Sequence, residues 1–88
     1  GKVADAAIKG KKIKFWKVEI AKEDELIVEN LDFLSNGTVL VSDQKDGLYI
    51  KAKDGVVKVL EIQGENGKRM PISDFLRGNK IEEFEVFE

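Results

Sequence analysis

The stretch Lys12–Ile20 alternates hydrophobic and polar residues, which predicts a β-strand. Ile13 and Phe15 share one face of that strand, whereas the apolar residues from Trp16 onward fall on the opposite positions. Two arrangements explain this change of phase. Either a β-bulge at Phe15–Trp16 turns the indole ring into the core, or Trp16 faces outward among the lysines. Because tryptophan is more often buried than exposed, the sequence favours the bulge.

Three tight-turn dipeptides divide the middle of the chain into segments rich in β-branched residues: Asn36-Gly37, Asp46-Gly47 and Asp54-Gly55. The segments that follow these turns predict strands over residues 38–41, 48–52 and 56–63. Strands at such intervals are typical of an all-β barrel or sandwich. A short apolar run over residues 26–28 is a further candidate strand.

The alternation ends in a polar loop over residues 64–71, and a helical pattern follows it. Ser73 is suited to cap a helix N-terminus and Gly78 to end the helix, so we expect one short helix near Ser73–Leu76 that plugs one end of the barrel. We divide the chain into three parts: a linker or cloning remnant over 1–9, the barrel over 10–80, and an acidic tail or edge strand over 81–88. Seven apolar residues are expected to lie mainly inside: Ile13, Phe15, Val39, Ile50, Val57, Val59 and Phe75.

The composition narrows the function classes. A chain of 88 residues suits one domain with a single core. The absence of Cys and His excludes disulfides and thiolate metal sites and removes the usual general base. No apolar run is long enough to span a bilayer. We therefore expect a cytoplasmic domain with no metal and no membrane partner. Four glutamates near the C-terminus lack the spacing of a calcium loop and are read as a solvated acidic tail: Glu82, Glu83, Glu85 and Glu88.

Charge is unevenly distributed although the net charge is only −2. Residues 1–22 carry seven lysines, whereas residues 23–32 carry five acids and no base. A basic surface therefore exists only if folding separates the acidic segment from the lysines. The candidate phosphate-binding residues lie in the first strand and in the loop around Gly67: Lys11, Lys12, Lys14, Lys17, Lys68 and Arg69. A solvated strand face that protects an edge against aggregation is the alternative explanation for these cations.

Several stretches in one collinear order carry a family resemblance. Gly10–Lys17 resembles the Gly-x-x-Ile/Val-Lys-Ile/Val-Trp-Lys strand that opens the C-terminal domain of methionyl-tRNA formyltransferases. Gly37–Leu40 resembles the Gly-Thr-Ile/Val-Leu turn and strand of the same domain. Further segments resemble its hairpins and its Asp-Phe-Leu-x-Gly ending: Asp46–Leu48, Asp54–Gln63, Gly67–Met70 and Asp74–Gly78. The match covers about residues 10–78.

The resemblance implies a mainly β fold with one short helix, an open Greek-key barrel similar to an OB-fold. It implies that the barrel follows a separate catalytic domain, which transfers a formyl group from 10-formyltetrahydrofolate to methionyl-initiator tRNA. The barrel then helps to hold the tRNA through a basic surface. The family's catalytic Asn, His and Asp belong to the other domain, so no catalytic or cofactor-binding residue is expected here. The alternative is a structural module of another formyltransferase, acting on amino sugars or folate, whose barrel packs against its neighbour and contacts no tRNA.

Overall fold

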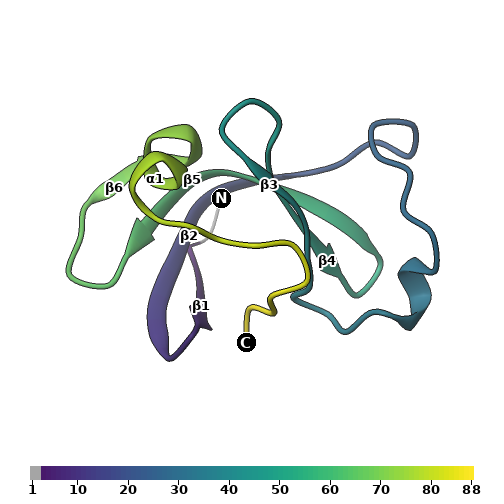
Figure 1. Cartoon of the computed structure of the whole chain (residues 1–88), viewed down its shortest axis with the longest axis horizontal. Coiled ribbons are helices and arrows are strands. Elements are labelled where there is room, and N and C mark those ends of the chain that lie inside the picture. The colour runs from purple at the N-terminus through teal and green to yellow at the C-terminus, as the bar shows by residue number, and fades with distance from the viewer. Residues whose placement is uncertain (1–2) are drawn as a thin grey trace.

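The computed structural model describes residues 3–88 as one bent antiparallel sheet with a short helix at one end (Figure 1). The sheet has six strands in the path β1-β2-β5-β4-β3, with β6 paired to β5. The strands are β1 (Ala4–Ile8), β2 (Lys11–Ile20), β3 (Val39–Asp43), β4 (Gly47–Ala52), β5 (Gly55–Gly64) and β6 (Arg69–Pro71). A 3-10 turn, η1 (Leu31–Phe33), precedes β3, and the helix α1 (Ile72–Gly78) follows β6. The expected mainly β fold with one short helix is confirmed.

The long strands β2 and β5 meet at a β-bulge, at the position where the sequence changes phase. Phe15 is paired with Ile62 and Lys17 with Glu61, so Trp16 is the extra residue between them. A second register shift follows between Lys17 and Val18. The predicted bulge is confirmed, but the predicted burial of the indole is wrong. Trp16 is half-buried outside the core, because its ring lies on the face opposite Ile62.

The core lies inside the curve of the sheet, where α1 covers one end. All seven residues expected to lie inside either belong to the core or pack against it. The most completely buried side chains come from three different strands: Val39, Leu48, Val59 and Ile62. Helix α1 contributes Ile72 and Phe75. A Cβ added to Gly64 would lie 2.9 Å from the Phe75 ring, so a glycine at the end of β5 allows the helix to pack closely.

Strand pairing within residues 3–88 does not close the sheet into a barrel, and the last eight residues bridge its two edges. We call residues 81–88 the C-terminal segment. At the β1 edge, Ala7 and Glu88 exchange two backbone hydrogen bonds of 2.9 and 2.8 Å. At the β3 edge, the Val39 N–H donates to the Glu85 carbonyl oxygen at 2.8 Å, and Thr38 forms a β-bridge with Val86. This segment is therefore integrated into the fold.

Three local expectations are corrected by the structure. Residues 1–2 of the expected linker lie outside the described residues, but Ala4–Ile8 form strand β1 through pairing with β2, in a hairpin that turns at Lys9–Gly10. The apolar run over 26–28 forms no strand, and Ile27 is 90% exposed. Pro71, and not Ser73, is the N-cap residue of α1, because the helix already begins at Ile72.

No helix of the described residues is long and apolar enough to cross a membrane.

Candidate functional site

Cations from β2 and β6 lie on one face of the sheet because of its register. Lys14 is paired with Gln63 of β5, and Gln63 is paired in turn with Arg69 of β6. Directly opposed residues on paired strands lie on the same face, so these three side chains form a row across the sheet. Lys12 shares the face of Lys14 by strand alternation, and Lys17 is paired with Glu61, which shares the face of Gln63. We call this surface of β1, β2, β5 and β6 the outer face.

Trp16 organises the centre of the outer face through two contacts. Its indole Nε1–H donates a 2.8 Å hydrogen bond to Oε1 of Gln63, and the Gln63 amide donates at 3.0 Å to the carbonyl oxygen of Gly67. The guanidinium carbon of Arg69 lies 4.8 Å from the centroid of the Trp16 ring, within the range of a cation–π contact. The Arg69 Nε–H also donates to Glu61 at 2.6 Å. The turn between β5 and β6 is thereby fixed to β2.

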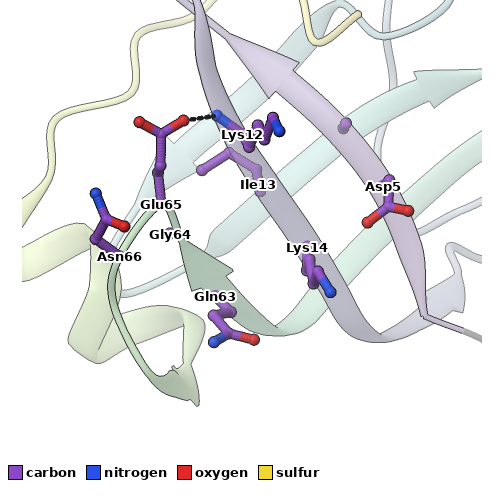
Figure 2. Close-up of a pocket in the computed structure, with 9 residues that line it drawn as sticks. Asp5, Lys12, Ile13, Lys14, Gln63, Gly64, Glu65 and Asn66 are labelled. Carbon is purple, nitrogen blue, oxygen red and sulfur yellow. Dashed lines mark hydrogen bonds between the residues drawn. The ribbon is translucent and has the colours of Figure 1, made fainter.

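A hollow of about 610 Å³ opens on this face beside the row of cations. Figure 2 shows its lining: Glu65 and Asn66 from the β5–β6 turn on one side, Asp5 from β1 on the other, and the β2 lysines between them. The backbone N–H of Lys12 donates to Glu65 at 2.9 Å. The hollow is open to solvent, and charged groups of both signs line it together with Ala6 and Ile13.

The structure brings together most of the predicted site residues, but Lys11 lies apart. By strand alternation Lys11 faces the side opposite Lys12, where it lines a separate hollow near Phe75 and Ile81. Lys68 is exposed in the turn just before β6. The outer face and this turn therefore carry five cationic side chains, from Lys12, Lys14, Lys17, Lys68 and Arg69. Three carboxylates lie among them, those of Asp5, Glu61 and Glu65, and a fourth, that of Glu19, shares the face of Lys17 by strand alternation.

Folding places the acidic segment at the far end of the molecule from β6. In Figure 1 the connection between β2 and β3 extends to one end of the long axis, and α1 and β6 lie at the other end. The longest extent of the molecule is 35 Å. Because charges in physiological salt are screened over about 8 Å, the acids at that end act weakly on the cations of β6. Glu25, in contrast, lies 3.9 Å from Lys58, whose strand partner Glu19 shares the face of Lys17. Folding therefore separates the acidic segment from the β6 end of the outer face, and not from its Lys17 end.

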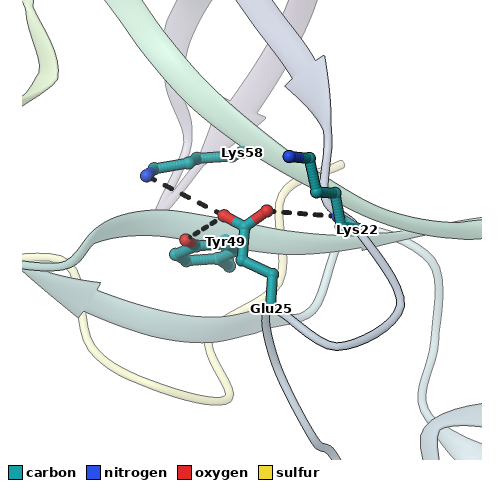
Figure 3. A network of polar contacts seen from close by, with 4 residues as sticks. All are labelled: Lys22, Glu25, Tyr49 and Lys58. Atoms are coloured by element: carbon teal, nitrogen blue, oxygen red, sulfur yellow. Dashed lines mark hydrogen bonds and ion pairs between the residues drawn. The ribbon is translucent and has the colours of Figure 1, made fainter.

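A second polar cluster holds the acidic connection against the sheet (Figure 3). The Tyr49 hydroxyl donates a hydrogen bond to Glu25, whose carboxylate also accepts the backbone N–H of Lys22 at 3.1 Å. Lys58 lies 3.9 Å from the same carboxylate and 5.3 Å from the Tyr49 ring centroid. The hydrogen bond from Tyr49 lowers the pKa of Glu25 and raises the pKa of Tyr49 itself. Glu25 therefore connects the loop between β2 and β3 to strands β4 and β5, and we call this set of contacts the clip at Glu25.

The outer face presents groups that can contact a charged ligand. Its groups are ammonium and guanidinium donors, amides, carboxylates and one indole ring. Within the described residues, no group of three or more His, Cys, Asp or Glu is placed to hold a metal ion. Sequence reasoning missed Gln63 and the four carboxylates as members of this face. The polar positions Glu61 and Gln63, alternating with apolar ones at the end of β5, were the signal that could have identified two of them.

Comparisons with known proteins agree with the family resemblance. Residues 3–80 match the family model described as formyl transferase, C-terminal domain. The chain is 41% identical over 78 residues to a methionyl-tRNA formyltransferase of Caldicellulosiruptor saccharolyticus, covering 89% of this chain and 23% of the relative. It is 35% identical over 75 residues to the enzyme of that name from Halothermothrix orenii, covering 85% of this chain and 23% of the relative. The chain thus spans about a quarter of the length of these relatives.

Proposed function

Because the chain belongs to the formyl transferase C-terminal domain family, we propose that its outer face holds the tRNA substrate of a methionyl-tRNA formyltransferase. The substrate is the initiator methionyl-tRNA. Lys12, Lys14 and Lys17, with Lys68 and Arg69 from the β5–β6 turn and β6, contact phosphates of the RNA backbone. Such contacts release condensed counterions and need no base recognition.

The cross-strand row from Lys14 through Gln63 to Arg69 is the observation that carries this proposal. It unites cations that lie more than 50 residues apart in the sequence on one surface. The acidic connection between β2 and β3 extends to the end of the molecule away from β6 (Figure 1). The remaining carboxylates reduce the positive potential of the outer face, so binding is expected to be weak and to depend steeply on salt.

The formyl transfer itself belongs to another part of the proposed parent enzyme. There, 10-formyltetrahydrofolate donates the formyl group in the cytoplasm, and this domain supplies no catalytic residue and no cofactor contact. The Greek-key, OB-like description of the barrel is part of the same proposal. The curved sheet and the bridging C-terminal segment support it.

A tRNA titration at several salt concentrations tests the proposal. The double variant Lys12→Glu with Lys14→Glu should weaken binding and flatten the salt dependence, since about 0.7–0.9 log units of affinity are lost per decade of salt for each phosphate contact. The matched control is Lys45→Glu with Lys53→Glu, which makes the same charge change at exposed lysines in the β3–β4 and β4–β5 turns. The control should retain more affinity and a steeper slope.

Equal loss in both double variants would show that net charge alone governs the interaction, and would contradict a site on the outer face. If the unmodified domain binds no tRNA, either alone or joined to its catalytic domain, the tRNA-binding proposal is wrong and the alternative function remains. The domain would then be a structural module that packs against its neighbour.

A further inference from the structure

The guanidinium of Arg69 is held in a defined orientation at the centre of the outer face. The Trp16 ring supports it at 4.8 Å, and Glu61 binds its Nε–H at 2.6 Å. Trp16 is itself fixed by the 2.8 Å hydrogen bond to Gln63. The Arg69 side chain nevertheless remains 50% exposed. Contact with Trp16 and Glu61 therefore leaves a flat, oriented cation open to solvent.

A simple phosphate contact does not require this arrangement. Arginine binds phosphate through its fork of N–H donors, but here the Nε–H is already donated to Glu61, whose charge also neutralises part of the charge that phosphate would need. A guanidinium held 4.8 Å from the centroid of an aromatic ring is instead suited to stacking, because unpaired RNA bases stack on arginine planes and on aromatic side chains. The orienting contacts also reduce the side-chain entropy that a base would otherwise have to immobilise on binding.

We propose that the Trp16–Arg69 pair is a stacking site for an unpaired RNA base. The inference rests on the proposed function and extends it, since the outer face then recognises a single-stranded or looped segment as well as backbone phosphates. The hollow lined by Lys12, Lys14 and Asn66 lies beside the row from Lys14 to Arg69 and offers room for the adjoining nucleotide (Figure 2). Bases in a continuous duplex are stacked on one another and cannot use this site.

The fluorescence of Trp16 provides a direct measurement, because it is the only tryptophan of the chain. The probes are a single-stranded RNA 12-mer and a blunt RNA hairpin with the same number of phosphates, whose strands are joined by a polyethylene glycol linker so that it has no unpaired base. Each probe is titrated at fixed salt. The single strand should change the Trp16 emission and bind more tightly than the hairpin. Equal affinity for the two probes with unchanged emission would overturn the stacking site and leave the phosphate-binding proposal intact. Failure of both probes to bind would overturn both proposals.

The variant Arg69→Lys removes the planar guanidinium but keeps the positive charge, so it tests stacking separately from charge. This variant should bind the single strand about fivefold or more weakly, in line with the loss of one stacked base, and should bind the hairpin almost unchanged. The matched control is Arg77→Lys, at the other arginine of the chain, which pairs with Asp74 at 3.3 Å on α1. Trp16→Leu, measured by anisotropy of labelled RNA, should reproduce the selective loss. If that variant does not fold, Arg69→Lys on the exposed surface decides the question. An equal effect of Arg69→Lys on both probes would contradict stacking.

Discussion

Gly37 faces the backbone of Phe87 so closely that a Cβ on Gly37 would lie 2.0 Å from the Phe87 carbonyl oxygen. Gly37 also has a φ of +92°, a backbone conformation that side chains disfavour. In return, the Phe87 N–H donates a 2.8 Å hydrogen bond to the Gly37 carbonyl oxygen. A glycine at this position therefore allows the C-terminal segment to bridge the edges of the sheet.

Gly37→Ala should displace the C-terminal segment and destabilise the domain. The matched control is Gly10→Ala, because Gly10 has a φ of +77° and a Cβ added there would meet no atom within 4 Å. The free energy of unfolding of the control should fall by only about 1–2 kcal/mol, because alanine disfavours the positive φ. In Gly37→Ala the clash with Phe87 adds to the strain of the positive φ, so we expect the free energy of unfolding to fall by about 2–5 kcal/mol. Urea unfolding measures both values, and equal losses would show that the close contact is relieved without cost.

Phe87→Ala should remove much of the stability that the C-terminal segment contributes. The Phe87 side chain is 5% exposed, and its ring meets that of Phe15 edge to face at a centroid distance of 5.1 Å. Truncation of a buried phenylalanine costs about 3–5 kcal/mol, a large part of the stability of a small domain. Phe33→Ala is the control, since Phe33 is 88% exposed and should change the unfolding free energy by less than about 0.5 kcal/mol. Similar losses in the two variants would contradict the assigned role of the C-terminal segment.

The clip at Glu25 should make stability depend on acid pH. Its pKa is lowered in the folded state, chiefly by the hydrogen bond from Tyr49, so the ionised form favours folding. This contribution to stability is present at neutral pH. It is lost as the pH falls from about 4.3, the ordinary pKa of a glutamate in the unfolded chain, through the lower pKa of Glu25 in the folded state. Glu25→Gln should therefore be less stable than the original at pH 7 and should lose less stability on acidification. Melting temperatures from pH 7 to pH 3 test this, with exposed Glu83→Gln as the control that should follow the original curve.

Removal of a carboxylate from the outer face should strengthen RNA binding. Asp5 of β1 is paired across the sheet with Lys14 and opposes the approach of phosphate there. Asp5→Asn should raise tRNA affinity at low salt by about twofold or more, because the lysine then acts without a neighbouring negative charge. The control is Asp54→Asn in the β4–β5 turn, which removes the same charge at an exposed position away from the outer face. A larger gain from the control would place the RNA elsewhere.

Local patterns were sufficient to predict the hairpin region and the helix. Strand β3 begins shortly after a turn dipeptide that favours positive φ, and β4 and β5 begin at the glycine of such a dipeptide. All three strands contain β-branched residues, so each local preference agrees with the final fold. The helix ends at Gly78, as expected. The identity of the family was also accessible, because its motifs are collinear in the sequence. The candidate site was only partly accessible: alternation placed Lys12 and Lys14 together, but their neighbours on β5 and β6 depend on register.

The sequence by itself determined the elements whose partners are adjacent in the chain and the number of cations available. Only the tertiary structure decided which residues and strands that lie far apart in the sequence are paired. Trp16 lies against Gln63 and Arg69 because the β2–β5 register gives it those neighbours, and a bulge alone does not specify which face a ring takes. The C-terminal segment is ordered because its backbone hydrogen-bonds to strand edges more than 40 residues away. Such contacts are selected by the total burial and hydrogen bonding of the fold, which no local alternation of residues encodes.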